Sequence, residues 1–342
     1  MDIGKRIGTA TKFSCILIMI SGVSIPYLVL SILYVMTGHY NEFLLWTIGY
    51  PADYLSQIPA SQFFSILVPQ AEYVFSTMTA IWTLSCVGLL FTIGNVRHMP
   101  AVQIILLYAV FSFLSITPGF YFRPHYFLLL TPVAALLAGY GLDQIRIIAG
   151  NLGTEIAEKG VPILVFLIAV FLSLNQQRDY LFKMNSAEVS RSVFGLNPFY
   201  ESIAISKYIN DRSTPNDEIA VIGSEPQIYF YAKRRAATGF LYMYPLMERH
   251  DNSLKMQKQL SLEIEKHMPL FLVFVKYPYS WLQRPDSNVY VFKWADSYIK
   301  KYYHMNAIVE LSKNGPVYVD KVDAEYRIGN PYWVAIYKRN DY

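Results

Sequence analysis

Long apolar segments dominate the first half of the chain and are missing from the second half. Five of them stand out, at residues 13–36, 73–94, 101–118, 126–142 and 161–174. A helix needs about 20 apolar residues to cross the hydrocarbon core of a bilayer. The first two segments reach that length, the next two come near it, and the last is also compatible with a buried core helix. The pattern predicts a membrane α-helical bundle of about five transmembrane helices over residues 1–177.

After residue 174 the pattern becomes polar, and residues 178–342 alternate between helical and strand periodicity. Helices are predicted at 200–210, 253–267 and 294–303, and the sequence "SEPQIYFYAKRR" at 224–235 predicts the start of a further one. Short apolar runs predict strands at 218–223, 270–275, 306–311, 315–320 and 332–339. This alternation predicts a small α/β domain that follows the transmembrane region.

Composition supports a membrane protein with a soluble part. Of the 342 residues, 54% are hydrophobic and 16% are charged, against about 25% charged in ordinary soluble domains. The net charge of +4 is spread along the chain, and without a basic block we expect no nucleic-acid binding.

Cys15 and Cys86 both lie in apolar segments, where we expect each cysteine to act as a small buried hydrophobic residue. The first apolar segment is too long for a signal peptide, so we expect it to be retained.

Lysine and arginine in the short loops predict the orientation of the helices, because these residues favour the cytoplasmic side. The basic residues fall in three loops that the five-helix pattern places on one side: Lys5, Arg6, Lys12, Arg97, Arg146 and Lys159. Residues 37–72 contain neither lysine nor arginine and are predicted to face outward. The α/β domain is then extracytoplasmic, and Arg123 becomes the one basic residue in an outer turn.

Arg123 lies in the stretch "PGFYFRPHYFLLLTP", residues 118–132, between two apolar segments. A charged side chain at the centre of a span costs about 2.5–3.5 kcal/mol on insertion scales, and less near the interface. Such a cation therefore marks a binding partner or a site. The alternative is a side chain that extends to the lipid headgroups and only anchors the turn.

The predicted outer loop, residues 37–72, is rich in aromatic residues, as expected for a segment that lies along the membrane interface. Pro51 is expected to interrupt any long helix there. Asp53 and Tyr54 form a possible outer-loop site. The alternative for Asp53 is a solvated or helix-capping acid.

The turn "VIGSEPQIYFYAKRRAA", residues 221–237, follows a predicted strand and precedes a helix, an arrangement that can bind anions. It lacks the glycines of a phosphate loop, and Glu225 has the wrong charge. We expect Ser224 to cap the helix, with Pro226 in its first turn. No metal or cofactor motif is present, and surface roles are expected for the scattered histidines His39, His98, His250, His267 and His304.

Three stretches together are similar to one protein family: "GHYNEFLLWTIGYPADY", "FYFRPHYFLLLTPVAALLAGYGL" and "IAVIGSEPQIYFYAKRRAATGFLY". Their order resembles the C-terminal half of bacterial family 39-like membrane glycosyltransferases. These are relatives of protein O-mannosyltransferases and of the aminoarabinose transferase that modifies lipid A, and they share the C-type membrane glycosyltransferase fold. The resemblance covers nearly the whole chain.

The resemblance implies a function at the outer face of the bacterial inner (plasma) membrane. Such enzymes transfer a sugar from a polyprenyl-phosphate donor, and a cation at the interface stabilises the leaving phosphate. Arg123 is then expected to bind the donor phosphate, with His125 and Tyr126 donating hydrogen bonds beside it. Membrane lipid and the lipid-linked donor are the implied partners, and no cofactor is expected.

The chain also departs from this family. The family carries a catalytic acid in its first outer loop and about eleven to thirteen spans, whereas this sequence shows five segments and no such acid after the first. We therefore expect a fragment, a chain whose N-terminal half is a separate protein, or a descendant that is inactive alone. The alternative is a non-catalytic membrane protein whose exterior α/β domain binds a partner or a glycan. A transporter is disfavoured because the segments hold few ionisable residues.

Overall fold

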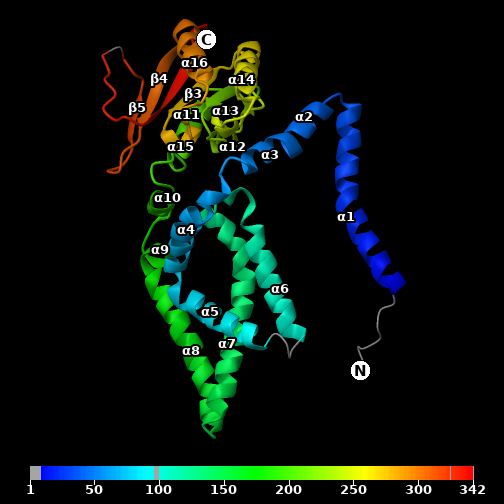
Figure 1. The fold of residues 1–342 in the computed structure, drawn as a ribbon. Helices are drawn as coiled ribbons and strands as arrows, with labels where there is room; N and C mark the ends of the chain where they lie inside the picture. Colours follow the sequence, from blue (N-terminus) through cyan, green and yellow to red (C-terminus); the bar gives the residue numbers. More distant parts are fainter. Residues whose placement is uncertain (1–8, 96–99, 324, 342) are drawn as a thin grey trace. The chain divides into compact units, whose positions relative to one another are not determined.

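The computed structural model describes residues 9–95, 100–323 and 325–341 (Figure 1). The chain forms two compact units, Met1–Gln57 and Ile58–Tyr342. The elements of the first unit are α1 (Thr9–Met36), α2 (Tyr40–Leu44), a π-helical segment (Leu45–Gly49) and α3 (Tyr50–Leu55).

The π-helical segment of the first unit ends directly before α3. Pro51, which lacks a backbone N–H, falls in the first turn of α3. The prediction that Pro51 interrupts the helix is therefore wrong: the backbone stays helical from Tyr40 to Leu55, with a change of helix type before the proline. Phe43 is buried against Tyr34 of α1, with ring centroids 4.8 Å apart.

The second unit begins with the remaining apolar helices. They are α4 (Phe63–Thr77), α5 (Thr79–Asn95), α6 (Pro100–Ser115), α7 (Thr131–Gly150) and α8 (Glu155–Gln176), with short 3-10 helices at Ala60–Gln62, Pro118–Phe120 and Pro124–Leu130. By length and composition, three continuous helices of the described chain can cross a membrane: Phe13–Met36, Pro124–Gly150 and Glu155–Gln176. The last of these corresponds to the shortest predicted segment. It is 22 residues long and 11% buried, so it is not a core helix.

The second predicted span, residues 73–94, is wrong as a single straight helix. The chain bends by 113° at Met78, between α4 and α5. The hydroxyls of Ser76 and Thr77 donate to carbonyls within their own helix, which favours bending. Side chains at the end of α8 complete the break, because Gln176 and Gln177 donate to the carbonyls of Ser76 and Thr77.

The bent pair counts as a fourth span at most, and α6, with 16 residues, is shorter than the 20 that a full span needs. The structure thus contains a membrane-type helical region without establishing the predicted number of five. Cys15 and Cys86 are free and exposed on these apolar helices, so the prediction that they are buried is wrong. In membrane proteins, exposed apolar helix faces of this kind are the ones that contact lipid.

α5 and α7 pack closely through glycines. A Cβ atom added to Gly88 would lie 1.8 Å from the carbonyl oxygen of Leu137, and one added to Gly141 would lie 3.1 Å from Gly88. Ser85 donates a hydrogen bond of 2.9 Å from its hydroxyl to the carbonyl of Ala134. Small residues and interhelical hydrogen bonds are the usual means by which membrane helices associate.

The α/β domain follows α9 (Arg178–Phe182) and α10 (Ser186–Phe194). Its helices are α11 (Glu201–Asn210), α12 (Gln227–Ala232), α13 (Tyr244–Met247), α14 (Ser253–His267), α15 (Pro278–Trp281) and α16 (Tyr290–Tyr302). Its strands are β1 (Glu218–Ile222), β2 (Arg235–Ala236), β3 (Phe271–Lys276), β4 (Tyr303–Glu310), β5 (Val317–Asp320) and β6 (Trp333–Arg339). Each helix and strand predicted in this domain corresponds to one of these elements, although the helix predicted at 294–303 begins at Tyr290 and Tyr303 opens β4. β2, α13 and α15 were not predicted.

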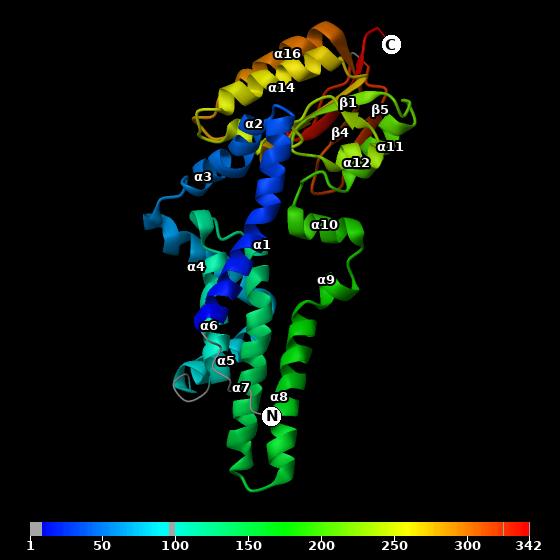
Figure 2. The same cartoon turned by 90° about the vertical axis from the view of Figure 1, so that its right-hand side faces the viewer.

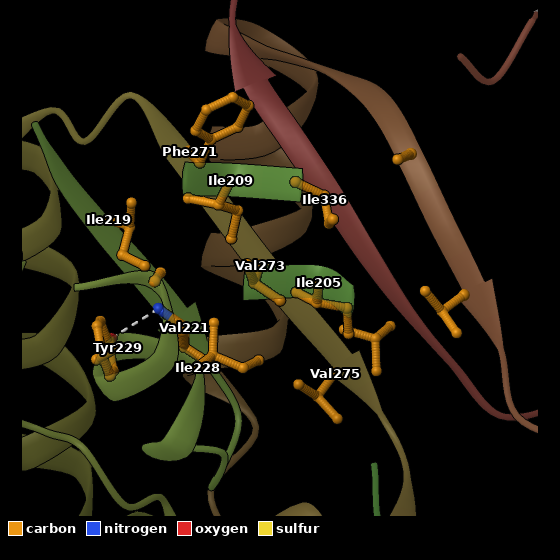
Figure 3. Packing of buried hydrophobic residues seen from close by; sticks show 14 of the residues in the cluster. Ile205, Ile209, Ile219, Val221, Ile228, Tyr229, Phe271, Val273, Val275 and Ile336 are labelled. Carbon is orange, nitrogen blue, oxygen red and sulfur yellow. Dashed lines mark hydrogen bonds between the residues drawn. The ribbon is translucent and has the colours of Figure 1, made fainter. Parts of the chain in front are cut away.

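The six strands form one mixed sheet in the order β2-β1-β3-β6-β4-β5. β1 pairs in parallel with β2 and β3, and the remaining pairs are antiparallel. Figure 2 shows α14 and α16 side by side on one face of the sheet, with α11 and α12 on the other. Figure 3 shows the core under α11 and α12, where alternate residues of the strands meet Ile205, Ile209 and Ile228. The residues of a strand that face this core are two apart, as Ile219 and Val221 are in β1, while the residues between them are mostly buried as well, so the central strands are covered on both faces.

Candidate functional site

The turn that bears Arg123 is held in a strained backbone conformation. Gly119, Phe120 and Phe122 have positive φ angles of 70°, 55° and 43°. Glycine adopts this region freely, but phenylalanine does so at a cost of about 1–3 kcal/mol, and such strain clusters at functional sites. Phe122 is nevertheless fully buried. The surrounding structure therefore fixes the turn against its own local preference.

Aromatic packing accounts for the stability of this turn. Phe122 forms a small core with Ile116 and Phe127. The ring of Phe63, at the start of α4, packs edge-on against Phe122 at 5.0 Å and against Phe120 at 5.3 Å. Edge-to-face aromatic pairs of this kind contribute about 0.5–1.5 kcal/mol each beyond their buried area.

Arg123 directly follows the buried Phe122 and is itself half-buried. Its extended backbone starts the 3-10 helix Pro124–Leu130, and its carbonyl accepts a hydrogen bond of 2.8 Å from the amide of Tyr126. The guanidinium carbon lies 5.4 Å from the centroid of the Tyr121 ring, within cation–π range. The guanidinium is thus positioned by a rigid turn rather than by a flexible loop.

The other residues singled out in the sequence lie in different places. His125 is exposed and meets the Tyr126 ring edge-on, with centroids 4.7 Å apart. These two therefore lie beside Arg123 at the start of the same 3-10 helix. Asp53 and Tyr54 belong to α3 of the first unit, where Asp53 is exposed in the first helical turn and Tyr54 packs near Tyr50.

Residues from the α/β domain also act on this turn, and sequence reasoning did not identify them. The hydroxyl of Tyr121 accepts a hydrogen bond from the side chain of Arg284. Burial raises the pKa of Tyr121 above its ordinary value, and the negative charge of Glu248 raises it further, whereas Arg284 and Arg123 lower it. Two guanidinium groups and one carboxylate therefore share the surroundings of a single phenol.

Tyr242 and Tyr244 belong to the same surroundings. Their rings are 4.2 Å apart, and the Tyr244 hydroxyl donates a hydrogen bond of 2.5 Å to the carbonyl of Tyr279. Burial raises the pKa of both phenols, and the positive charge of Arg123 opposes that rise in each. The one sequence feature that could have pointed to these two tyrosines is the aromatic cluster after β2, within "GFLYMYPLMERH".

The loops after β1 and β3 meet at the carboxyl ends of these two parallel strands. The chain leaves β1 toward α12 and leaves β3, through α15, toward α16. Figure 2 shows α12 and α16 on opposite faces of the sheet. Ligands of α/β domains bind at such topological switch points. Gly223 allows the close approach, since an added Cβ would lie 2.6 Å from Val275 and 2.9 Å from the Ser280 hydroxyl.

Glu225 is the buried acid of this switch point. It is 1% exposed, and one carboxylate oxygen accepts a hydrogen bond of 2.5 Å from the Gln227 amide. Burial raises its pKa from 4.5 to about 7, while hydrogen bonds from Gln227 and Ser280 act in the opposite direction. An acid that titrates near neutral pH is a recurrent feature of functional sites.

The predicted capping role of Ser224 is wrong. The residue that precedes α12 is Pro226, which has no side-chain capping bond. Ser224 is instead buried, and its hydroxyl accepts a hydrogen bond of 2.9 Å from the amide of Met243. The serine thereby ties the turn after β1 to the tyrosine-bearing segment, a long-range contact that local sequence patterns do not reveal.

Some predicted features lie outside the described residues, namely the basic residues Lys5, Arg6 and Arg97 and the histidine His98. Arg146 pairs with Asp143 and Glu158 at 3.0 and 2.6 Å, where α7 and α8 are joined.

Within residues 9–95, 100–323 and 325–341, no group of histidine, cysteine or acidic side chains is arranged to hold a metal ion. No family model matches this chain, and no curated protein is significantly similar to it.

Proposed function

We propose that this protein is a membrane-bound component of glycosyl transfer that binds a polyprenyl-phosphate-linked sugar at the outer face of the bacterial plasma membrane. In this proposal Arg123 binds the phosphate of the donor. The observation that carries it is the placement of a half-buried guanidinium on a strained, aromatic-packed turn between two apolar helices. A fixed cation at that position suits a phosphate attached to a membrane-embedded chain.

The chemistry of glycosyl transfer explains why such a cation is needed. When the bond between the sugar and the phosphate breaks, negative charge develops on the phosphate oxygens. A guanidinium that is already in place stabilises this charge without reorganising. Tyr121 and Tyr126 supply neighbouring hydroxyl groups, and His125 is exposed beside them. In this proposal these residues bind and orient the leaving group.

The topology proposed for this function places the Arg123 turn and the α/β domain on the outer side. It is supported by the basic residues at the opposite ends of the apolar helices, Arg146 and Lys159 among them. The alternative function, a non-catalytic membrane protein that binds a glycan, is favoured by an aromatic cavity in the α/β domain.

Lipid binding by the purified chain tests the proposal. Native mass spectrometry in a detergent without sugar headgroups would compare a short-chain polyprenyl phosphate with the uncharged polyprenol of equal length. We expect the phosphate to bind at least about tenfold more tightly, the size of one charge-assisted contact. Equal binding of the two lipids would show that only the apolar chain is recognised, and the phosphate assignment would be abandoned.

A further inference from the structure

A cavity of about 450 Å³ lies at the carboxyl end of β3, apart from the Arg123 turn. Its aromatic lining consists of Phe274, Tyr277, Trp281, Phe292 and Tyr332. The volume falls within the range of small-molecule sites, which are usually apolar with a few polar groups that set specificity. Here the polar groups besides the tyrosine hydroxyls are Lys276 and Gln283.

The aromatic rings of this cavity are fixed in position before any ligand binds. The indole N–H of Trp281 donates a hydrogen bond of 2.8 Å to the carbonyl of Val275, so this ring is locked to β3. Phe292 packs against Trp281 with ring centroids 4.5 Å apart, and Phe274 does so at 6.1 Å. Trp281 is only 4% and Tyr277 only 6% exposed, so the ring faces open to a ligand are those of the half-buried Phe274, Phe292 and Tyr332. These faces are preordered by the packing beneath them, which lowers the entropic cost of binding.

Tyr332 forms one wall of the cavity, and the loop that precedes it is fixed by hydrogen bonds to the buried carboxylate of Glu310. Glu310 is 3% exposed and accepts hydrogen bonds from Tyr326, Gly329 and Asn330, directly before this wall. Burial alone would raise the pKa of Glu310, but these hydrogen bonds outweigh it and hold the pKa below its ordinary value. Glu310 thus remains charged at neutral pH, and its charge is satisfied by the loop that it fixes.

The lining of the cavity carries one cation and no acidic residue. Lys276 is exposed, and its ammonium nitrogen lies 5.5 Å from the centroid of the Trp333 ring. In the sheet, Trp333 of β6 is the register partner of Lys276 in β3 and of Glu310 in β4. Glu310 is already engaged by the Tyr326 hydroxyl, the Gly329 amide and both the backbone and side-chain amides of Asn330. The positive charge of Lys276 therefore favours an anionic ligand.

We propose that this cavity binds the pyranose ring of an acidic sugar, with the carboxylate of a hexuronic acid held by Lys276. The C–H groups on one face of a pyranose stack on aromatic rings, whose faces are electron-rich. The hydroxyl groups at the ring edge find hydrogen-bonding partners in Gln283 and Tyr332. The cavity serves an acceptor or product glycan outside the membrane, and its existence does not depend on the phosphate site.

Ligand titration of the full-length protein tests this proposal. The protein is purified in a detergent that carries no sugar, because maltoside headgroups would compete for the site. Tryptophan fluorescence and saturation-transfer NMR then measure binding of methyl glucuronide, methyl glucoside and cyclohexanecarboxylate. We expect the glucuronide to bind about five- to tenfold more tightly than the glucoside, and this preference to shrink as salt rises.

Two variants and a control assign the parts of the site. Lys276→Gln should reduce glucuronide binding to the level of the glucoside, while Tyr332→Ala should weaken both sugars. Lys313→Gln removes an exposed lysine elsewhere in the domain and should change neither. Equal binding of the two sugars, equal or tighter binding of cyclohexanecarboxylate, an unchanged preference in Lys276→Gln, or no binding at about 50 mM would each overturn the proposal. None of these outcomes affects the polyprenyl-phosphate assignment, whose ligand and residue are different.

Discussion

The guanidinium carbon of Arg123 lies 5.4 Å from the ring centroid of Tyr121, and the hydroxyl of the same tyrosine accepts a hydrogen bond from Arg284. Tyr121 thus connects the cation of the membrane-side turn with a second cation of the α/β domain. Under the proposed function, a phosphate ester bound at this turn would therefore meet groups from both parts of the second unit. The predictions below test the helical region, the acid of the switch point, the topology and finally Arg123.

The packing of α5 on α7 should not tolerate a larger residue at Gly88. Because an added Cβ would lie 1.8 Å from the Leu137 carbonyl oxygen, Gly88→Leu must push the helices apart. We expect a loss of several degrees in melting temperature, or failure to purify as a monodisperse species. Gly94→Leu is the matched control, since an added Cβ there meets no atom within 4 Å. Equal behaviour of the two variants would contradict the helix crossing.

The elevated pKa of Glu225 predicts a distinct pH dependence of stability. Burial favours the protonated form, so the contribution of this group is fully present below pH 4.5 and is lost as pH rises to about 7. The shift corresponds to roughly 3 kcal/mol at most. Glu225→Gln cannot ionise, and its melting temperature should therefore vary less than that of the wild type between pH 4.5 and 7.

Thermal melting of the purified chain across this pH range measures the effect. Glu325→Gln, which replaces an exposed acid, serves as the control and should follow the wild type. If Glu225→Gln and the wild type lose stability in parallel as pH rises, Glu225 does not titrate in this window.

Much of the α/β domain could be predicted from sequence because its pattern is local. The run "LFLVFV" is apolar throughout, as expected for a central strand covered on both faces, and it forms most of β3. The helix predicted at 253–267 coincides with α14, which ends where Met268 adopts a left-handed backbone and Pro269 follows. Continuous periodicity without glycine or proline made this helix easy to identify.

The features that the sequence did not reveal depend on long-range contacts. The bend at Met78 interrupts a continuous apolar segment, and hydropathy does not record the direction of a helix axis. Arg123 could be singled out because a charge between apolar segments is conspicuous. Its neighbours Glu248 and Arg284 could not, since they come from loops far along the chain that only the folded domain brings close.

The proposed topology predicts opposite compartments for two positions. Reporter fusions at Arg97 and Lys183 should report the cytoplasm and the exterior, respectively, because the basic residues of the inner loops favour the cytoplasmic side. Alkaline phosphatase and a fluorescent protein, which are active on opposite sides, give complementary signals. If both fusions report the same side, the number or the direction of the spans between them is wrong.

The identity of the cation at position 123 tests the central proposal, because a lysine keeps the charge but loses the planar, two-pronged hydrogen-bonding geometry. Arg178→Ala is the control, since it removes an exposed arginine elsewhere in the second unit without touching the turn. The most direct measurement is the affinity of a short-chain polyprenyl phosphate for the wild type, Arg123→Lys, Arg123→Ala and Arg178→Ala, with folding checked by melting temperature. We predict weaker binding in Arg123→Lys, a loss of about ten- to a hundredfold in Arg123→Ala, and no change in the control. Equal affinity of all four proteins, or no binding by any of them, would contradict the assignment of Arg123 to the donor phosphate.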